Sequence, residues 1–553
     1  MDRRTLLFVV ISVLILVVYQ EFVLKHVVPP PLHPETEVAE PLSGPLEAPA
    51  PKADTAAPAV SPAEAQLADE RAEAPIEGQR ITVETDLFEA VFSTAGGRME
   101  SFTLKRYRQT DAPDSPLLTL VAPAPEIDLP LGLELRGART WSDSRTVYTA
   151  DQTSLALHGT DSGKLVLRGE VAGRPIVKTL TFQANAYTIG LDVSVPSGGE
   201  LPPELTQAGP NGEAASIALV MSRRLPVQKS STSFEGAATV LDSKLHQYAL
   251  SDVTEPVILN GDVAWAGFED HYFITAAAPD ESTGIQVRRG PSDLQTKILT
   301  AQAGQGPNEL VYTLYFGPKD ERTLEAAGHQ LVKSLNLGWF GPISLILLKV
   351  LSFSHRVTGN YGLDIILLTV LVKIAFWPLT RKSFESMRAM QKVQPEMQRL
   401  REKYKDDAKQ LNTEMMELYR RHKVNPLGGC LPMVLQIPVF IGLYQALLNT
   451  IELRHAPFML WIHDLAAPER VMVLGYGIPV LTLLLGASMF LQQKMSPPAG
   501  DPAQQRIMMF MPLVFTFMFI GFPAGLTLYW LTNNVLTIVQ QWFMLRSTAP
   551  APA

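Results

Sequence analysis

The sequence is poor in cysteine and lacks the short motifs of the common enzyme classes. Cys430 is the only cysteine among 553 residues, which excludes an intrachain disulfide. No HExxH, GxSxG, GxGxxG or P-loop pattern stands in the structural context that its chemistry requires. The histidines lack metal-ligand spacing, so we expect neither an enzyme nor a cofactor. The net charge of −8 argues against a specific nucleic-acid binder, because such domains are usually basic.

Long hydrophobic runs are confined to the start and the last third of the chain. The first run, Leu6–Tyr19, follows Arg3 and Arg4, and no small-residue cleavage site comes after it. We therefore predict an uncleaved membrane anchor over residues 1–24, with a cleaved signal peptide as the alternative. Residues 25–79 are rich in Pro, Ala and Glu and have few aromatics, which predicts a disordered tether.

Residues 80–318 carry short alternating runs instead, for example Lys164–Val171, Ile176–Phe182 and Tyr187–Val195. Gly, Pro, Asn and Asp separate these runs, and the pattern predicts an antiparallel β-sandwich or barrel. Residues 319–356 form a linker that contains Trp339–Phe353, an apolar stretch with polar ends. We expect this stretch to be an amphipathic helix in the membrane interface.

The remaining apolar runs predict a membrane core over residues 357–546, followed by a short tail at 547–553. With the anchor they make six membrane-spanning helices, and the five in the core are Gly362–Thr380, Leu431–Leu448, Val471–Leu491, Ile507–Phe522 and Leu526–Leu545.

A basic stretch at residues 382–426 lies between the first two core runs. From Arg381 to Pro426 there are twelve Lys and Arg against seven Asp and Glu. Apolar residues recur there at spacings of three and four around a break at Asp406-Asp407, which predicts a helical hairpin. The positive-inside rule places the hairpin and both chain termini in the cytoplasm and the β domain outside.

Lys373 lies inside an otherwise apolar run. Its Cα is eight residues from Arg381, or about 12 Å deep at the helical rise. One interpretation is a lysine that extends to the headgroups, and the other is a functional cation that faces protein or water. Thr369, Lys373 and Thr380 share one helix face, which favours the second interpretation.

Other polar residues fall within the later runs. Asn533, Thr537 and Gln540 repeat on one helix face, with Asn534 and Gln541 beside them, and Gln436 lies in the second core run. Each group is costly in lipid unless it is hydrogen-bonded or hydrated. Hydrogen bonding between helices would explain any one of them. Three polar stripes together favour a shared hydrophilic cavity with apolar walls that include Trp530.

The sequence also resembles the YidC membrane protein insertase family, densely over residues 314–544 and more weakly in the β domain. The motifs that carry the resemblance appear in order along the chain: Tyr315-Phe-Gly-Pro-Lys319, Gly359-Asn-Tyr-Gly362, Trp377-Pro-Leu-Thr380, Asn425-Pro-Leu-Gly-Gly-Cys430, Gln436-Ile-Pro438, Trp461-Ile-His-Asp464, Gln493-Lys-Met-Ser-Pro497, Phe522-Pro-Ala-Gly-Leu526, Tyr529-Trp530 and Asn533-Asn534.

This resemblance implies a five-helix insertase core with a groove open to the cytoplasm and lipid, and a periplasmic β-supersandwich. It implies an inner-membrane location and a function in inserting and folding membrane proteins, alone or with the Sec translocon. The implied partners are the translocon with its accessory subunits, the ribosome, membrane lipids and small one- and two-span substrates such as ATP synthase subunit c and phage coat proteins.

The expected site residues divide into two groups. The groove would be lined by Lys373, Thr369, Gln436, Asn533, Asn534, Thr537 and Trp530, and the hairpin would meet substrate or ribosome through Arg388, Lys392, Arg399, Arg401, Lys403 and Lys405.

The sequence departs from the family pattern at Lys373 and in its tail. Family members usually present arginine where this chain has Lys373, so the charge is kept without the bidentate fork. The tail is short and nearly uncharged, so any ribosome contact should depend on the hairpin. The alternative function is a solute or ion transporter that uses the same cavity, although no internal repeat supports it.

Overall fold

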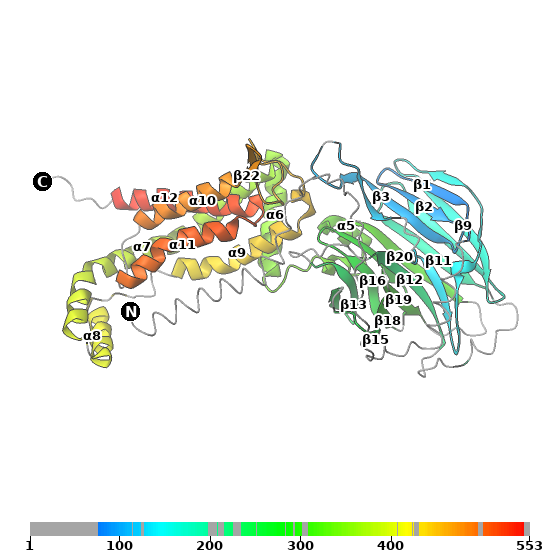
Figure 1. Ribbon diagram of the computed structural model, residues 1–553, viewed down its shortest axis with the longest axis horizontal. Coiled ribbons are helices and arrows are strands. Elements are labelled where there is room, and N and C mark those ends of the chain that lie inside the picture. Colours follow the sequence, from blue (N-terminus) through cyan, green and yellow to red (C-terminus); the bar gives the residue numbers. More distant parts are fainter. Residues whose placement is uncertain are drawn as a thin grey trace, which may run out of the picture. The chain divides into compact units, whose positions relative to one another are not determined.

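The computed structural model describes residues 76–546, with gaps at 113, 123–126, 197–206, 208–214, 225–233, 250–251, 283, 291–292, 301–307, 406, 423, 425–430 and 496–501. The predicted anchor, almost all of the tether, Cys430 and the tail lie outside these residues. The chain divides into two units, one β-rich up to Ser334 and one helical from Leu335, which also takes in Thr110–Ser115. Figure 1 shows the strands of the first unit and the helices of the second.

The first unit contains three sheets, and nearly all of their strand pairs are antiparallel. The five-stranded sheet has the order β4 (Leu117–Val121), β3 (Arg98–Arg108), β2 (Phe88–Ser93), β1 (Arg80–Glu84) and β8 (Ser154–Ala156), with β1 and β8 parallel. The nine-stranded sheet has the order β14 (Lys244–Ala249), β13 (Gly236–Leu241), β16 (Val263–Glu269), β17 (Phe273–Pro279), β20 (Asn308–Pro318), β11 (Thr188–Val195), β10 (Arg174–Gln183), β9 (Ser162–Val171) and β7 (Thr149–Ala150). The six-stranded sheet has the order β15 (Val257–Asn260), β18 (Gly284–Arg289), β19 (Asp293–Thr300), β12 (Ser216–Arg224), β5 (Gly132–Arg136) and β6 (Thr140–Ser142).

Burial along the strands shows how the sheets are layered. In β10 one face is buried, as its alternating sequence predicts, whereas every residue of β13 and β17 is buried. Strands β12 and β19 pack on β13 and β16, so the six-stranded sheet covers one face of the nine-stranded sheet. Phe102 of the five-stranded sheet packs against Phe316 of β20 at 5.1 Å between ring centroids. The unit is thus a layered β structure, in agreement with the predicted sandwich.

A buried ionic cluster lies inside the β unit. The short 3₁₀ helix η2 (Asp143–Arg145) supplies Asp143, whose carboxylate contacts Lys178 at 2.6 Å and Arg98 at 2.8 Å. Lys178 Nζ also donates to the main-chain carbonyls of Gly96, Gly97 and Leu131. Burial lowers the pKa of Lys178 to about 8. Arg98 lies in β3, Lys178 lies in β10 and Leu131 precedes β5, so this cluster connects one strand from each sheet.

Short helices close the first unit, and long helices build the second. Residues 320–335 do not form one helix: α5 (Glu321–Ala327) stops at Gly328, whose φ is +73°, and the 3₁₀ helix η3 (Leu331–Ser334) follows. The second unit contains α6 (Gly341–Thr358), α7 (Tyr361–Lys403), α8 (Ala408–His422), α9 (Leu431–Asn449), the 3₁₀ helix η5 (Ile451–Leu453), α10 (Val480–Met495), α11 (Pro502–Phe519) and α12 (Ala524–Arg546).

Helix α7 joins two expected elements into one helix of 43 residues. It contains both the Lys373 run and the first arm of the hairpin, and it includes Pro378 and Pro395. After the break at 404–407, α8 folds back along it. Val393, Met397, Leu418 and Val424 form the buried seam between the arms, in agreement with the periodicity of the sequence.

One expected run differs from the structure. The stretch Val471–Leu491 is not one helix, because a β-hairpin of β21 (Val471–Val473) and β22 (Tyr476–Ile478) precedes α10. Gly475, Gly477 and Pro479 account for this difference, since glycine weakens a helix interior and proline is suited to a helix start. Hydropathy alone cannot distinguish such a hairpin from the first turns of a helix.

Candidate functional site

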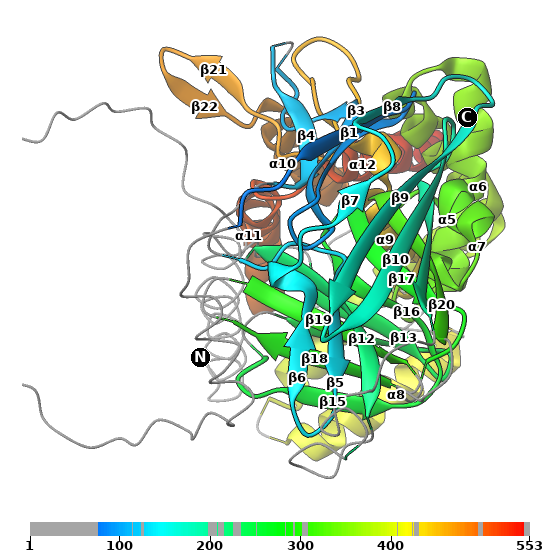
Figure 2. The ribbon, with the colours of Figure 1, turned by 90° about the vertical axis from the view of Figure 1, so that its right-hand side faces the viewer.

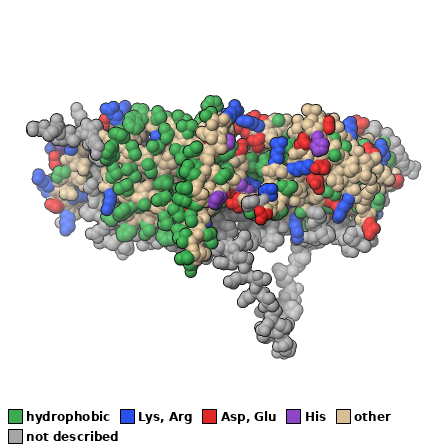
Figure 3. All heavy atoms as spheres, turned by 90° about the horizontal axis from the view of Figure 1, so that it is seen from above, with side chains coloured by type: hydrophobic (Ala, Val, Ile, Leu, Met, Phe, Trp, Pro, Cys, Tyr) green, Lys and Arg blue, Asp and Glu red, His purple; other side chains and the backbone are tan. Residues whose placement is uncertain are grey.

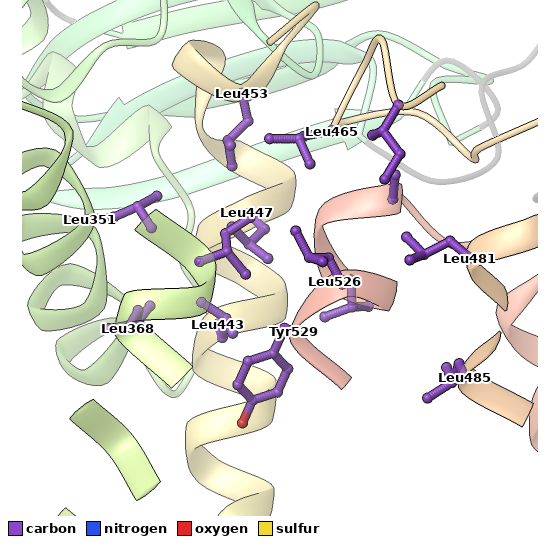
Figure 4. Close-up of a cluster of buried hydrophobic side chains, with 14 of the residues drawn as sticks. Leu351, Leu368, Leu443, Leu447, Leu453, Leu465, Leu481, Leu485, Leu526 and Tyr529 are labelled. Atoms are coloured by element: carbon purple, nitrogen blue, oxygen red, sulfur yellow. The ribbon is translucent and has the colours of Figure 1, made fainter. Parts of the chain in front are cut away.

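The helical unit is closed at one end by a packed apolar core. Leu351 of α6, Leu368 of α7, Leu443 and Leu447 of α9, Leu481 and Leu485 of α10, and Leu526 of α12 point toward one another there (Figure 4). Leu453 of the 3₁₀ helix η5 and the loop residue Leu465 belong to the same buried core. Two glycines permit close approach: a Cβ on Gly362 would lie 2.0 Å from Phe458, and one on Gly486 would lie 2.2 Å from Thr516.

Tyr529 marks the boundary between this core and a polar region. Its ring belongs to the core, and its hydroxyl lies 3.4 Å from Gln436 Nε2. The same Gln436 nitrogen donates to Asn533 Oδ1 at 2.9 Å. Along the sequence of α7 and α12, the core residues come before the polar residues Lys373 and Asn533. Along α9, which runs the opposite way, they come after Gln436. The polar side chains therefore all lie on the same side of the core, toward the end of α7 that continues into the hairpin.

Lys373 joins the same polar region through α12. Its ammonium donates to Thr537 Oγ1 at 2.8 Å, and the Thr537 hydroxyl donates to the Asn533 carbonyl at 2.7 Å. A chain of polar groups thus runs from Lys373 through Thr537 and Asn533 to Gln436 and Tyr529. Asn533 and Thr537 are buried, and Lys373 is half-buried. Three of the expected groove residues, Gln436, Asn533 and Thr537, are therefore brought together with Lys373.

The other expected groove residues make different contacts. The Thr369 hydroxyl donates to the Ile365 carbonyl of its own helix at 2.6 Å. Asn534 Nδ2 lies 3.3 Å from Ser488 Oγ of α10, away from the Lys373 chain. Trp530 packs edge-on against Phe440 at 5.2 Å between ring centroids, as an apolar wall residue would.

Sequence reasoning missed Tyr529 and Ser488 as members of the polar network. Tyr529, Asn533 and Thr537 repeat every four residues, so the helical period could have identified Tyr529. Ser488 gives no comparable signal, because serine is common among the small residues that pack between helices.

The hairpin residues are mostly at the surface. Lys392, Arg399, Lys403 and Lys405 are exposed, whereas Arg388 and Arg401 are half-buried. The Arg388 guanidinium donates to the Met544 carbonyl, which ties the start of the hairpin to the end of α12. Four of the six basic residues are thus available to bind an acidic partner.

The outer surface of the helical unit is apolar. Figure 3 shows hydrophobic side chains covering its visible face, with basic side chains toward the hairpin end. The exposed large apolar residues of these helices are Ile346, Phe353 and Val357 on α6, Leu363, Leu367, Leu371, Ile374 and Trp377 on α7, Ile437 on α9, Leu483, Leu484, Phe490 and Leu491 on α10, Met508, Met509, Phe510, Met511, Leu513 and Phe517 on α11, and Val535, Val539, Trp542 and Phe543 on α12.

An apolar surface of this extent is typical of a protein embedded in a membrane. Among the described residues, α7 is long and apolar enough to cross a bilayer, and Met508–Phe519 is a shorter apolar stretch. Apolar exterior and polar interior together define a helical membrane protein that carries a β-rich domain.

Comparisons with known proteins identify the family. Residues 80–350 match the YidC periplasmic domain, and residues 353–551 match the 60Kd inner membrane protein family. The membrane protein insertase YidC of Nitratidesulfovibrio vulgaris is 41% identical over 86% of this chain and 88% of its own length. That of Syntrophus aciditrophicus is 38% identical over 98% of this chain and 99% of its own. The chain belongs to the YidC family of membrane protein insertases.

It is accordingly an inner-membrane protein with a periplasmic β domain. A crystal structure of an active YidC insertase with its first transmembrane domain resolved is 17% identical, covers 87% of this chain and 97% of that chain, and has a TM-score of 0.37. The assignment rests on the sequence matches and not on that superposition. The relatives are named insertases, which counts against the transporter alternative.

Proposed function

We propose that this chain inserts membrane proteins through a hydrophilic groove formed by five of its helices. In this proposal α7, α9, α10, α11 and α12 span the inner membrane, and the anchor at residues 1–24 makes the sixth span. The hairpin of α7 and α8 and both chain termini lie in the cytoplasm. The groove opens toward the cytoplasm and lipid, and the apolar core around Leu443 and Leu526 closes its periplasmic end.

The single observation that carries the proposal is the environment of Lys373. An ammonium has three donors, and within the described residues its contact is one hydroxyl, that of Thr537. A cation held among apolar helices with so little solvation needs water or an anion nearby. Water in the groove would supply that need, and so would a carboxylate of an incoming chain.

This arrangement supports a mechanism without nucleotide hydrolysis or a covalent step. The short extracytoplasmic segment of a substrate enters the wet groove, where Lys373 offsets part of the dehydration cost of its carboxylate. Gln436, Asn533 and Thr537 exchange hydrogen bonds with its polar groups. The apolar segment moves along the outer faces of the helices into lipid, and hydrophobic transfer drives the remaining distance.

The remaining expected residues take supporting roles. Asn534 links α12 to Ser488 of α10, the Thr369 hydroxyl is paired within α7, and Trp530 forms part of the apolar wall of the groove. The exposed basic residues of the hairpin receive the substrate, and with the short tail they are also the candidate contact for the ribosome. The Sec translocon and its accessory subunits are the proposed partners for larger substrates, with the periplasmic domain as a docking surface.

Substitutions at Lys373 test the charge. Insertion of a one-span substrate with an acidic translocated segment, measured by protease protection, should survive Lys373→Arg, fall with Lys373→Ala and fall further with Lys373→Glu. Loss of a contact worth about 1.4 kcal/mol lowers the insertion equilibrium roughly tenfold. Lys164→Glu, the same charge change on an exposed residue of strand β9 in the β domain, is the matched control and should retain most of the activity. If the Lys373→Glu variant inserts the substrate at the wild-type level, the electrostatic role of Lys373 is disproved.

A further inference from the structure

The hairpin β21–β22 carries an unusually apolar tip. Met472, Leu474 and Tyr476 are 68%, 94% and 78% exposed, and Val473 is 44% exposed. No charged residue occurs between Val471 and Val480. Figure 2 shows the hairpin reaching away from the helices of its unit. An apolar projection of this kind is unfavourable in water.

The backbone of the tip makes the choice of residue more unusual. Leu474 and Gly475, the two residues that link the strands, have φ of +52° and +84°. A two-residue turn with both φ values positive favours Asn, Asp or Gly at its first position. Leucine is disfavoured there because its Cβ crowds the backbone. Leucine at position 474 is thus unfavourable for two reasons: its positive φ strains the backbone, and its exposed side chain is apolar. A residue kept at such a cost points to a function of its side chain outside the folded unit.

The hairpin is attached firmly to the start of α10. The buried Glu469 carboxylate accepts hydrogen bonds from Val480 N at 3.0 Å and Leu481 N at 3.1 Å, the first residues of that helix. The Arg470 side chain lies along the hairpin, since a Cβ on Gly477 would be 3.3 Å from its Cδ. Only Pro479 separates β22 from α10. The tip therefore cannot lie further than about 20 Å from the helix end, the reach of six extended residues.

We propose that this tip inserts into the headgroup region of the periplasmic leaflet and binds phospholipid beside α10. The proposal rests on α10 spanning the membrane, as put forward above. The apolar surface of the tip then continues that of α10, where Leu483 and Leu484 are also exposed. Tyr476 has the amphipathic ring that is enriched at membrane interfaces, and Arg470 at the base can meet lipid phosphates. The anchored hairpin sets the depth of α10 in the bilayer.

Depth-resolved fluorescence quenching tests this proposal on the full-length protein. In a Cys430→Ser background, the environment-sensitive dye NBD is attached to Leu474→Cys, and the protein is reconstituted in phosphatidylcholine–phosphatidylglycerol vesicles. Lipids with a spin label near the headgroup should quench this dye several-fold more than lipids labelled deep in the chain. Gln183→Cys on strand β10, exposed in the β domain, is the matched control and should not be quenched by either lipid.

Leu513→Cys on α11 separates this proposal from the proposed function. Position 513 is 58% exposed and should be quenched if α11 spans the bilayer. Quenching of the dye at 513 without quenching at 474 would overturn the lipid contact of the hairpin tip and leave the proposed function standing. That outcome would overturn the lipid contact even where a partner protein covers residue 474. An unquenched dye at 513 would overturn the membrane placement of the helices, and the anchor with it.

A second variant guards against disturbance of the turn by the dye. Leu474→Asn suits the positive φ, so it should preserve the hairpin while removing the apolar contact. A dye at Met472→Cys should then lose most of its quenching relative to the same dye with Leu474 present. Unchanged quenching in Leu474→Asn would contradict the role assigned to Leu474.

Discussion

Lys373 and Asp143 illustrate two ways of holding a charge away from bulk water. Asp143 is surrounded by Arg98, Lys178 and the Tyr148 hydroxyl, so its buried charge is neutralised and hydrogen-bonded on several sides. Lys373 has one neutral hydroxyl as its contact within the described residues. The first arrangement suits a permanent structural cluster. The second leaves donors open to water or to a passing carboxylate, which suits transient binding.

The structural cluster predicts an order of destabilisation. Asp143→Ala leaves Arg98 and Lys178 buried as like charges and should lower the free energy of unfolding of the β unit by about 3–5 kcal/mol. Lys178→Met should cost less, because Arg98 still pairs with Asp143. Denaturant unfolding followed by tryptophan fluorescence measures both values, and a larger loss in Lys178→Met would contradict this account.

A second buried carboxylate predicts a pH dependence. Burial raises the pKa of Glu269 above its ordinary 4.5, against the opposing effect of Lys319 at 3.3 Å. The folded state therefore binds more protons than the unfolded chain above pH 4.5, and this contribution to stability falls as pH rises through the raised pKa. The unfolding free energy of wild type minus that of Glu269→Gln should decrease with rising pH. A difference that stays constant or increases as the pH rises above 4.5 would contradict a raised pKa for Glu269.

At the scale of elements, the sequence pattern predicted most of the helices and several strands. The runs assigned to α9, α11 and α12 follow from their continuous apolar length, and the seam of the α7–α8 hairpin follows from spacings of three and four. The β-hairpin before α10 was not predicted, because Val471–Ile478 is as apolar as the first turns of a helix. Polar faces were predictable on α7 and α12, but the bonds from Lys373 to Thr537 and from Gln436 to Asn533 were not. Those contacts depend on how separate helices pack, which local periodicity does not encode.

Close packing at the closed end of the helical unit predicts a steric effect. Gly362→Ala would place a methyl group 2.0 Å from Phe458 and force that ring to move. Overpacking of this kind costs about 1–3 kcal/mol. The midpoint of thermal unfolding in detergent should therefore fall. Gly341→Ala, where the nearest atom is 3.6 Å away, is the control and should leave the midpoint unchanged or raise it. Equal midpoints for the two variants would argue against tight packing at Gly362.

At the scale of the whole molecule, the apolar exterior of the helical unit encloses a polar interior. The exterior favours membrane embedding, and the core around Leu443, Leu526 and Tyr529 closes one end. The polar chain from Lys373 to Gln436 begins where this core stops. In the proposed mechanism, these features shorten the dry part of the path that a polar segment must cross. The layered β unit has its own core and its own ionic cluster, so we expect it to fold independently of that path.

Water access at two adjacent positions of α7 shows whether Lys373 faces a hydrated groove. Lys373→Cys and Ile374→Cys, each in a Cys430→Ser background, are treated with a water-soluble maleimide in inverted membrane vesicles. Residue 374 is 63% exposed, whereas residue 373 is half-buried and therefore less accessible. Exposure in the structure alone thus predicts faster labelling at 374. We predict the reverse, because in the proposed function position 373 faces a wet groove and position 374 faces lipid. Labelling at 374 that equals or exceeds labelling at 373 would contradict the account.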